Sequence, residues 1–289
     1  MMSKYIILFV SMFLLSNVNA SEGSDGTQKF DNAYIEHHMS NSGEWHPFPF
    51  VDIKFGKTIF FIGPIEIKLS LHLLMMLFAF SILVFLFVFY LKKDPSKVPG
   101  KFGLAVEALV LYIRDELIAP HMDEKEMRFF LPYFLTVFFF ILLLNLLGLI
   151  PVFAPATANI NVTAGLASIT LVIMVAAGLR KHGLIGFFKL FLPPGVPKVM
   201  YVILFPLELM GLITKPLALT MRLFGNMLGG HIAISAIVSL VILFGYVGIP
   251  ALGMGLLLDL IEVLAVFLQA MIFTMLSAIY IGSMLSNHH

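Results

Sequence analysis

Residues 199–244 read VMYVILFPLELMGLITKPLALTMRLFGNMLGGHIAISAIVSLVILF, and this stretch decides the fold. It is almost continuously apolar, and its only formal charges are Glu208, Lys215 and Arg222. As a single helix it would be ~69 Å long, more than twice the ~30 Å thickness of the hydrocarbon core of a bilayer. We therefore expect one long, strongly tilted membrane helix.

The alternative is two shorter spans joined by a loop at KPLALTMR. That loop would lack Gly, Asn and Asp, which favour turns. It would also place Lys215 and Arg222 on the exported side, where the other connections carry no charge. The sequence therefore favours a hairpin of two long tilted helices, in which 199–244 pairs with 251–285 through the turn GYVGIP.

The whole chain has the composition of a membrane protein. Of its 289 residues, 60% are apolar and only 12% are charged, whereas soluble domains carry about 25% charged residues. The net charge of +1 gives no basic excess for nucleic acid. Because the chain has no cysteine, a disulfide framework, thiol catalysis and iron–sulfur clusters are excluded.

Three shorter apolar runs predict further crossings, because each is close to the ~20 residues that a transmembrane helix needs. These runs are Leu69–Leu91, Phe129–Ile150 and Val162–Leu179. Between the first two, KFGLAVEALVLYIRDELI is apolar but interrupted by charges, which favours an interfacial or re-entrant helix. The sequence predicts an all-α polytopic membrane protein over 67–289, with about five membrane-crossing helices and an interfacial helix.

Residues 1–20 have the layout of a secretory signal peptide. Lys4 gives a positive start, an apolar run follows, and Val18-Asn19-Ala20 resembles a cleavage site. The apolar run is too short to cross a bilayer, so the alternative is an uncleaved interfacial helix.

Residues 21–66 are polar and mixed, and we expect them to form an exported N-terminal segment. The histidines His37, His38 and His46 invite a metal site. Because no carboxylate–histidine spacing repeats around them, a solvated, partly disordered tail is favoured. No metal, cofactor or catalytic residue is predicted in the chain.

The charges of the loops predict the orientation in the cell (inner) membrane. The segments 92–101 and 180–198 are rich in lysine and arginine, whereas 151–161 and 245–250 carry no charge. Basic loops face the cytoplasm. We therefore expect the N-terminus outside and the C-terminus in the cytoplasm.

Arg222 is the charge that most needs an explanation, because an isolated arginine at the centre of a membrane helix costs about 2.5–3.5 kcal/mol on insertion scales. On a helix its neighbours on the same face are Ala218, Gly225 and Gly229, with Asn226 one turn further on. Such small residues let another helix approach closely. The alternative is an arginine that snorkels to the interface, past Lys215.

The last helix carries a second set of polar residues. Glu262 and Gln269 share a face, and Asp259 lies one turn before Glu262. If the two long helices are antiparallel, His231 and Glu262 fall at roughly matching depths, and so do Arg222 and Gln269. A histidine opposite a carboxylate in such an apolar region favours a proton relay.

Several motifs resemble those of subunit a of F-type ATP synthases over roughly residues 67–285. They are KPLALTMRLFGNMLGGH, PLELMGLI, LQAMIFTMLSAIYI, FFLPYFLTVFFFILLLNLLGLIP and NINVT. The resemblance implies a non-catalytic stator subunit that provides two offset proton half-channels beside a rotating ring of c subunits. It also implies a b-subunit stalk and the F1 sector as partners. The chain has no GxxxxGK[ST] loop, so nucleotide chemistry must lie on partner subunits.

The resemblance also implies roles for single residues. Arg222 would face the ring carboxylates, with Asn226 and Gln269 next to it. His231 and Glu262 would line the exported-side half-channel, and Glu208 the cytoplasmic-side one. Asp259 is a further candidate for proton translocation. Ala218 and Gly148 replace polar residues of other members, so neither is counted as a proton ligand.

Two other classes of function fit the sequence less well. A secondary cation/proton transporter usually has internal repeats, and the two halves of this chain show none. A purely structural scaffold would not need a lone membrane arginine flanked by glycines.

Overall fold

The computed structural model describes residues 44–48, 51–54, 58–62, 65–68, 71–90, 100–150, 153–192, 197, 200–244 and 249–286. The predicted signal peptide, His37, His38 and the C-terminal Asn287-His288-His289 lie outside the described residues.

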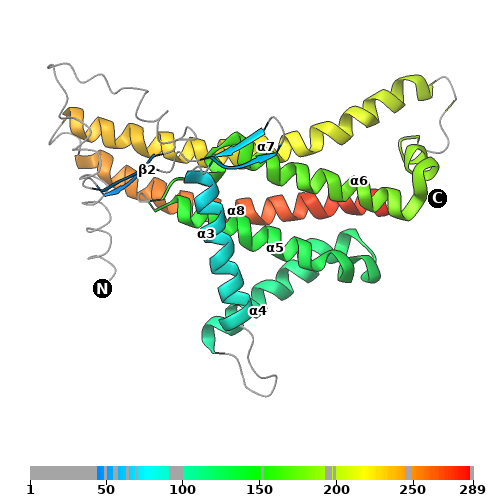
Figure 1. Cartoon of the computed structure of the whole chain (residues 1–289), viewed down its shortest axis with the longest axis horizontal. Coiled ribbons are helices and arrows are strands. Elements are labelled where there is room, and N and C mark those ends of the chain that lie inside the picture. Colours follow the sequence, from blue (N-terminus) through cyan, green and yellow to red (C-terminus); the bar gives the residue numbers. More distant parts are fainter. Residues whose placement is uncertain are drawn as a thin grey trace. The chain divides into compact units, whose positions relative to one another are not determined.

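Five helices of the described chain are long and apolar enough to cross a membrane (Figure 1). They are α3 (Leu71–Val84, continued by the π-helix η2, Phe85–Tyr90), α5 (Glu124–Gly148), α6 (Ile160–Leu190), α7 (Tyr201–Phe244) and α8 (Ile249–Leu285). The prediction of an all-α polytopic membrane protein with five crossings is confirmed.

Helix α7 is unbroken, so the single-helix prediction holds and the two-span alternative is wrong. Pro206 and Pro216 both lie inside it, although each proline removes a backbone N–H donor. The hydroxyl of Thr220 donates to the carbonyl of Pro216 at 2.9 Å, one turn after the second proline. At 44 residues, the helix is ~66 Å long and must tilt steeply to remain within a bilayer.

Helix α6 changes direction at Gly183, four residues beyond Leu179, where the third predicted span was expected to end. Gly183 has φ 69° and ψ 177°, a left-handed conformation that glycine adopts without a Cβ clash. The chain then returns to helix as far as Leu190.

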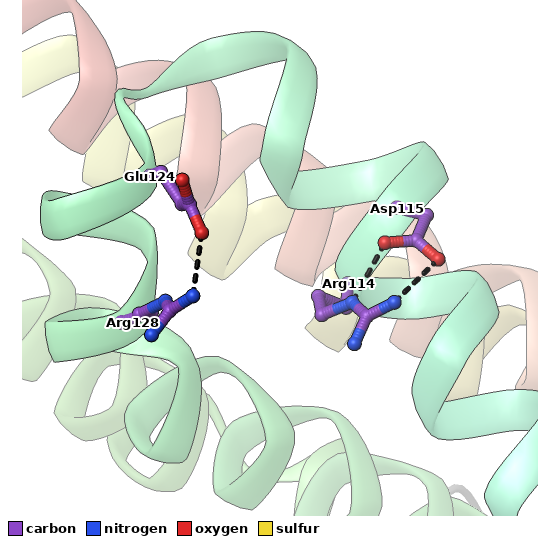
Figure 2. Close-up of polar contacts among 4 residues, drawn as sticks. All are labelled: Arg114, Asp115, Glu124 and Arg128. Carbon is purple, nitrogen blue, oxygen red and sulfur yellow. Dashed lines mark hydrogen bonds and ion pairs between the residues drawn. The ribbon is translucent and has the colours of Figure 1, made fainter.

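The segment between α3 and α5 is helical, as predicted. It comprises α4 (Lys101–Tyr112), the π-helix η3 (Ile113–Ile118) and the short 3-10 helix η4 (Ala119–His121). Figure 2 shows the guanidinium of Arg114 against the carboxylate of Asp115, with Nε to Oδ1 at 2.7 Å. This hydrogen bond holds the pKa of Asp115 below its usual value.

Two short β-hairpins precede the membrane helices, and the sequence analysis did not predict them. Strand β1 (Glu44–Phe48) pairs antiparallel with β2 (Val51–Lys54), and β3 (Thr58–Ile62) pairs antiparallel with β4 (Ile65–Lys68). The signal was present, because VDIK and IEIK each alternate apolar and charged residues. The segment expected to be a partly disordered tail therefore contains these short strands, and His46 lies on β1.

The chain divides into two compact units. Unit 1 contains the residues up to Ala79, Leu144–Asn159 and Met227–Ala265, and unit 2 contains Phe80–Leu143, Ile160–Asn226 and the residues from Val266 onwards. The helices α3, α5, α7 and α8 each contribute to both units.

The core of unit 2 is built from aromatic side chains. Phe134, Phe138 and Phe273 are fully or almost fully buried. The rings of Phe138 on α5 and Phe267 on α8 meet edge to face at 6.1 Å, a favourable arrangement for aromatic pairs. Leu219 and Leu223 of α7 are buried in the same core, which fixes the rotation of α7 about its axis.

Candidate functional site: an exposed membrane arginine and a buried carboxylate

Arg222 lies on the face of α7 that points away from the core of unit 2. Leu219 and Leu223 are 1% and 0% exposed, whereas Arg222, Gly225 and Asn226 are exposed. An added Cβ at Gly225 would meet no atom within 4 Å. The small residues beside Arg222 therefore leave open space on this face.

Arg222 has no hydrogen bond or ion pair with any residue that the structure describes. An unpaired charge on a membrane-crossing helix is costly and usually marks an ion pathway. The exposed guanidinium therefore has no counter-charge within the described residues.

Asn226 and Gln269 differ in their surroundings. Asn226 is exposed on the face of Arg222, one turn further along α7. Gln269 on α8 is only 5% exposed, and its Nε2 atom is buried without a hydrogen-bond partner among the described residues. Arg222 could donate only to the amide oxygen of Gln269, and no such hydrogen bond is present among the described residues.

Glu208 lies near the start of α7 and is exposed, as Arg222 is. The two residues are fourteen positions apart, so they lie ~40° apart around the helix and ~21 Å apart along it. Both side chains therefore project from similar sides of α7.

Unit 1 holds the other acidic candidates. Glu262 on α8 is 8% exposed, and neither of its carboxylate oxygens has a hydrogen-bond partner among the residues described. An added Cβ at Gly230 on α7 would overlap this carboxylate. The carboxylate thus packs directly against the backbone of α7, next to His231.

His231 and Asp259 are both half-buried in unit 1. Because the oxygens of Glu262 accept no hydrogen bond from a described residue, His231 and Glu262 are not directly bonded. The contact that the structure does show is between the Glu262 carboxylate and Gly230, the residue that precedes His231.

Unit 1 also contains a set of buried polar side chains that were not predicted from the sequence. The hydroxyl of Thr157 donates to Oδ1 of Asn145 at 2.7 Å, and the two residues are 0% and 2% exposed. His72, in the first turn of α3, is 2% exposed. An amide inside the apolar run Phe129–Ile150 was a readable signal, since polar groups in membrane helices are usually functional.

Within the described residues, no group of three or more histidine, aspartate or glutamate side chains is arranged to hold a metal ion. The polar atoms at these positions are carboxylates, imidazoles, amides and hydroxyls. Such groups accept and donate protons or hydrogen bonds.

Comparisons with known proteins identify the family of the chain. The family model described as ATP synthase A chain matches residues 73–282. Subunit a of ATP synthase from Myxococcus xanthus is 39% identical over 232 residues, which cover 78% of this chain and 76% of the relative. The subunit a from Chlorobium phaeobacteroides is 38% identical over 255 residues, covering 86% and 73%.

The subunit a from Anaeromyxobacter dehalogenans strain 2CP-C is 43% identical over 201 residues, which cover 68% of this chain but only 52% of the relative. The chain thus matches about half of the length of this relative. The family model nevertheless spans all five candidate membrane helices, in whole or in large part. The chain therefore belongs to the subunit a family of ATP synthases.

Proposed function

We propose that this chain is the proton-translocating stator subunit of an F-type ATP synthase. It lies in the cell (inner) membrane beside a ring of c subunits, with the b-subunit stalk and the F1 sector as further partners. Its N-terminus is outside and its C-terminus is cytoplasmic. It couples proton flow to rotation of the ring, while ATP is made on F1.

The observation that carries this proposal is the exposed guanidinium of Arg222, which has no ion-pair partner in the part of the chain that the structure describes. A carboxylate of the ring is neutral in lipid, because a buried charge is heavily penalised. Beside the guanidinium the charged form becomes favourable, and the carboxyl group releases its proton. Because Arg222 remains charged, it also prevents a proton from passing directly between the two half-channels.

The remaining polar residues belong to the two half-channels. Glu262, His231 and Asp259 form the exported-side path, and the contact of the Glu262 carboxylate with Gly230 supports this grouping. Glu208 belongs to the cytoplasmic-side path, which suits its exposure near the start of α7. Asn226 and Gln269 adjust the surroundings of Arg222.

The driving force sets how many such transfers are needed. One elementary charge that moves across 100 mV is worth about 2.3 kcal/mol, so several protons must pass for each ATP. A rotating ring with several equivalent carboxylates meets this requirement, since each carboxylate passes Arg222 in turn.

The test is Arg222→Ala in the complete complex, reconstituted in vesicles under an imposed proton gradient. We expect ATP synthesis to be abolished and passive proton flux to rise, because a protonated ring carboxylate can then pass the stator. Arg114→Ala is the matched control, since Arg114 is an exposed arginine outside the candidate spans and its ion pair with Asp115 is open to solvent.

ATP synthesis by the assembled Arg222→Ala complex would overturn the proposal. Purification of the chain as a small homo-oligomer without a ring would favour the secondary cation/proton transporter instead.

A further inference from the structure

Arg222 is not the only cation on its face of α7. Lys215 precedes it by seven residues, which places the two side chains within ~20° of each other around the helix and ~10.5 Å apart along it. On geometry alone, α7 would offer two positive charges to a partner on this side.

The two cations have different surroundings in unit 2. Arg222 is exposed, whereas Lys215 is half-buried. The ammonium of Lys215 lies over the ring of Tyr280 on α8, 5.6 Å from its centroid. This distance is within the range of a cation–π interaction. Lys215 therefore turns toward α8, while Arg222 remains on the open face.

Because α7 is tilted, the position of the Lys215 ammonium matters for a ring carboxylate that moves past the helix. Because α7 is too long to cross a bilayer upright, a separation along its axis becomes partly a separation in the membrane plane. A ring carboxylate that moves at constant depth would then pass near the Lys215 position as well as Arg222. A free ammonium there would pair with the carboxylate and hold it at the wrong place.

We infer that Tyr280 is a positioning residue for proton transfer. Its ring holds Lys215 against α8, so that Arg222 is the single cation that the described length of α7 presents to a ring carboxylate. This inference rests on the proposed stator function, and it adds a residue that acts through Lys215.

The experiment compares four variants of the whole complex in reconstituted vesicles: Tyr280→Leu, Tyr280→Phe, Lys215→Met and the double variant Tyr280→Leu with Lys215→Met. Each is assayed for proton-driven ATP synthesis and for copurification with the ring. Leucine removes the aromatic face, phenylalanine keeps it, and methionine removes the ammonium but keeps a similar length of chain.

We expect Tyr280→Leu to lower ATP synthesis about threefold to tenfold, the population change that a cation–π contact can support, with normal assembly. Tyr280→Phe and Lys215→Met should stay close to the unmodified complex. The double variant should recover most of the activity, because it has no ammonium left to interfere. A purely structural role of Tyr280 would not allow this recovery.

Unchanged synthesis by Tyr280→Leu would overturn the inference, and so would a double variant as impaired as Tyr280→Leu alone. If the Tyr280→Leu complex fails to assemble, Tyr280→Met takes its place. ATP synthesis by Tyr280→Met alone is then compared with that of the double variant Tyr280→Met with Lys215→Met. Arg222→Ala is measured in parallel. If Arg222→Ala abolishes ATP synthesis and Tyr280→Leu does not change it, the proposed stator function still holds and only the inference about Tyr280 is rejected.

Discussion

The carboxylate of Glu262 on α8 lies against the backbone of α7 at Gly230. An added Cβ at this glycine would overlap Oε1 and Cδ of Glu262, whereas an added Cβ at the preceding Gly229 would meet nothing within 4 Å. The absence of a side chain at Gly230 therefore fixes how closely this buried carboxylate approaches α7 and the neighbouring His231.

We expect the variant Gly230→Ala to impair proton transport without lowering the stability of the folded chain. The overlapping atoms belong to the far end of a flexible side chain, so the carboxylate can rotate away at little cost in folding free energy. We expect normal assembly but a loss of proton-driven ATP synthesis of about tenfold or more, because small misplacements of a reacting group have large effects on rate.

Gly253→Ala is the control for this variant. Gly253 lies on α8 and, like Gly230 on α7, is within a candidate span, but an added Cβ there meets nothing within 4 Å. The same loss of synthesis in both variants, or full activity of Gly230→Ala, would show that the contact between Gly230 and Glu262 has no functional importance.

Exchanging His231 and Glu262 tests whether the two residues act together. The double variant His231→Glu with Glu262→His keeps one basic and one acidic group beside Gly230, whereas a single change to alanine leaves one of them alone. Removing one partner of a buried ionisable pair usually costs more than replacing both. ATP synthesis by the exchanged variant should therefore exceed that of His231→Ala and of Glu262→Ala. Equal activity in all three would argue against the pairing.

The number and extent of the membrane helices could be predicted from the sequence because its apolar runs contain very few charged residues. Lys215 and Arg222 made an exported loop improbable, and α7 is indeed continuous between them. The all-α class and the number of crossings followed from the lengths of the apolar runs. These features depend on composition over many residues, which a sequence displays directly.

The contacts between helices were not readable in the same way. Counting residues from the turn between the two long helices placed Arg222 and Gln269 at similar depths in the membrane. Such a count does not give the rotation of each helix about its own axis. Burial of Leu223 turns Arg222 outward, whereas Gln269 is buried. The contact of Glu262 with Gly230 also depends on this rotation, and periodicity alone cannot specify it.

Lys181 should matter for the stability of unit 2. Its ammonium forms an ion pair with Glu126 of α5 at 2.6 Å and also donates to the carbonyl oxygen of Leu285 at the end of α8. The side chains of Lys181 and Glu126 are only 24% and 20% exposed. Loss of the ammonium leaves both acceptors without this donor, so we expect Lys181→Met to lower the free energy of unfolding by about 1–3 kcal/mol.

Thermal unfolding of the purified complex in detergent measures this effect. Arg128→Met is the matched control, because Arg128 pairs with Glu124 at 2.6 Å and the two side chains are 75% and 70% exposed (Figure 2). Such an exposed pair contributes about 0–1 kcal/mol. Equal shifts of Tm in the two variants would contradict the role assigned to Lys181.

The orientation can be tested with single cysteines, since the chain contains none. We expect a membrane-impermeant thiol reagent to label Ser24→Cys from the exported side. The same reagent should label His289→Cys only in inverted vesicles, because the basic loops face the cytoplasm and five crossings separate the two ends. Labelling of His289→Cys from the exported side would reverse or reject the topology.

The variant Arg222→Lys tests whether a positive charge at this position is sufficient for proton-driven ATP synthesis. Lysine keeps a charge but loses the planar, delocalised fork of arginine, and it is readily deprotonated when it is desolvated. We therefore expect Arg222→Lys to abolish proton-driven ATP synthesis nearly as completely as Arg222→Ala. The measurement is ATP formation and passive proton flux in the same reconstituted vesicles.

Assembly should be unaffected in this variant, because Arg222 projects from the open face of α7 and contributes nothing to the core around Leu219 and Leu223. A complex that fails to assemble would assign Arg222 a structural role. Appreciable synthesis by an assembled Arg222→Lys complex would mean that any cation at this position is enough to discharge a ring carboxylate. The mechanism would then not depend on a cation that stays protonated when it is desolvated, as arginine does.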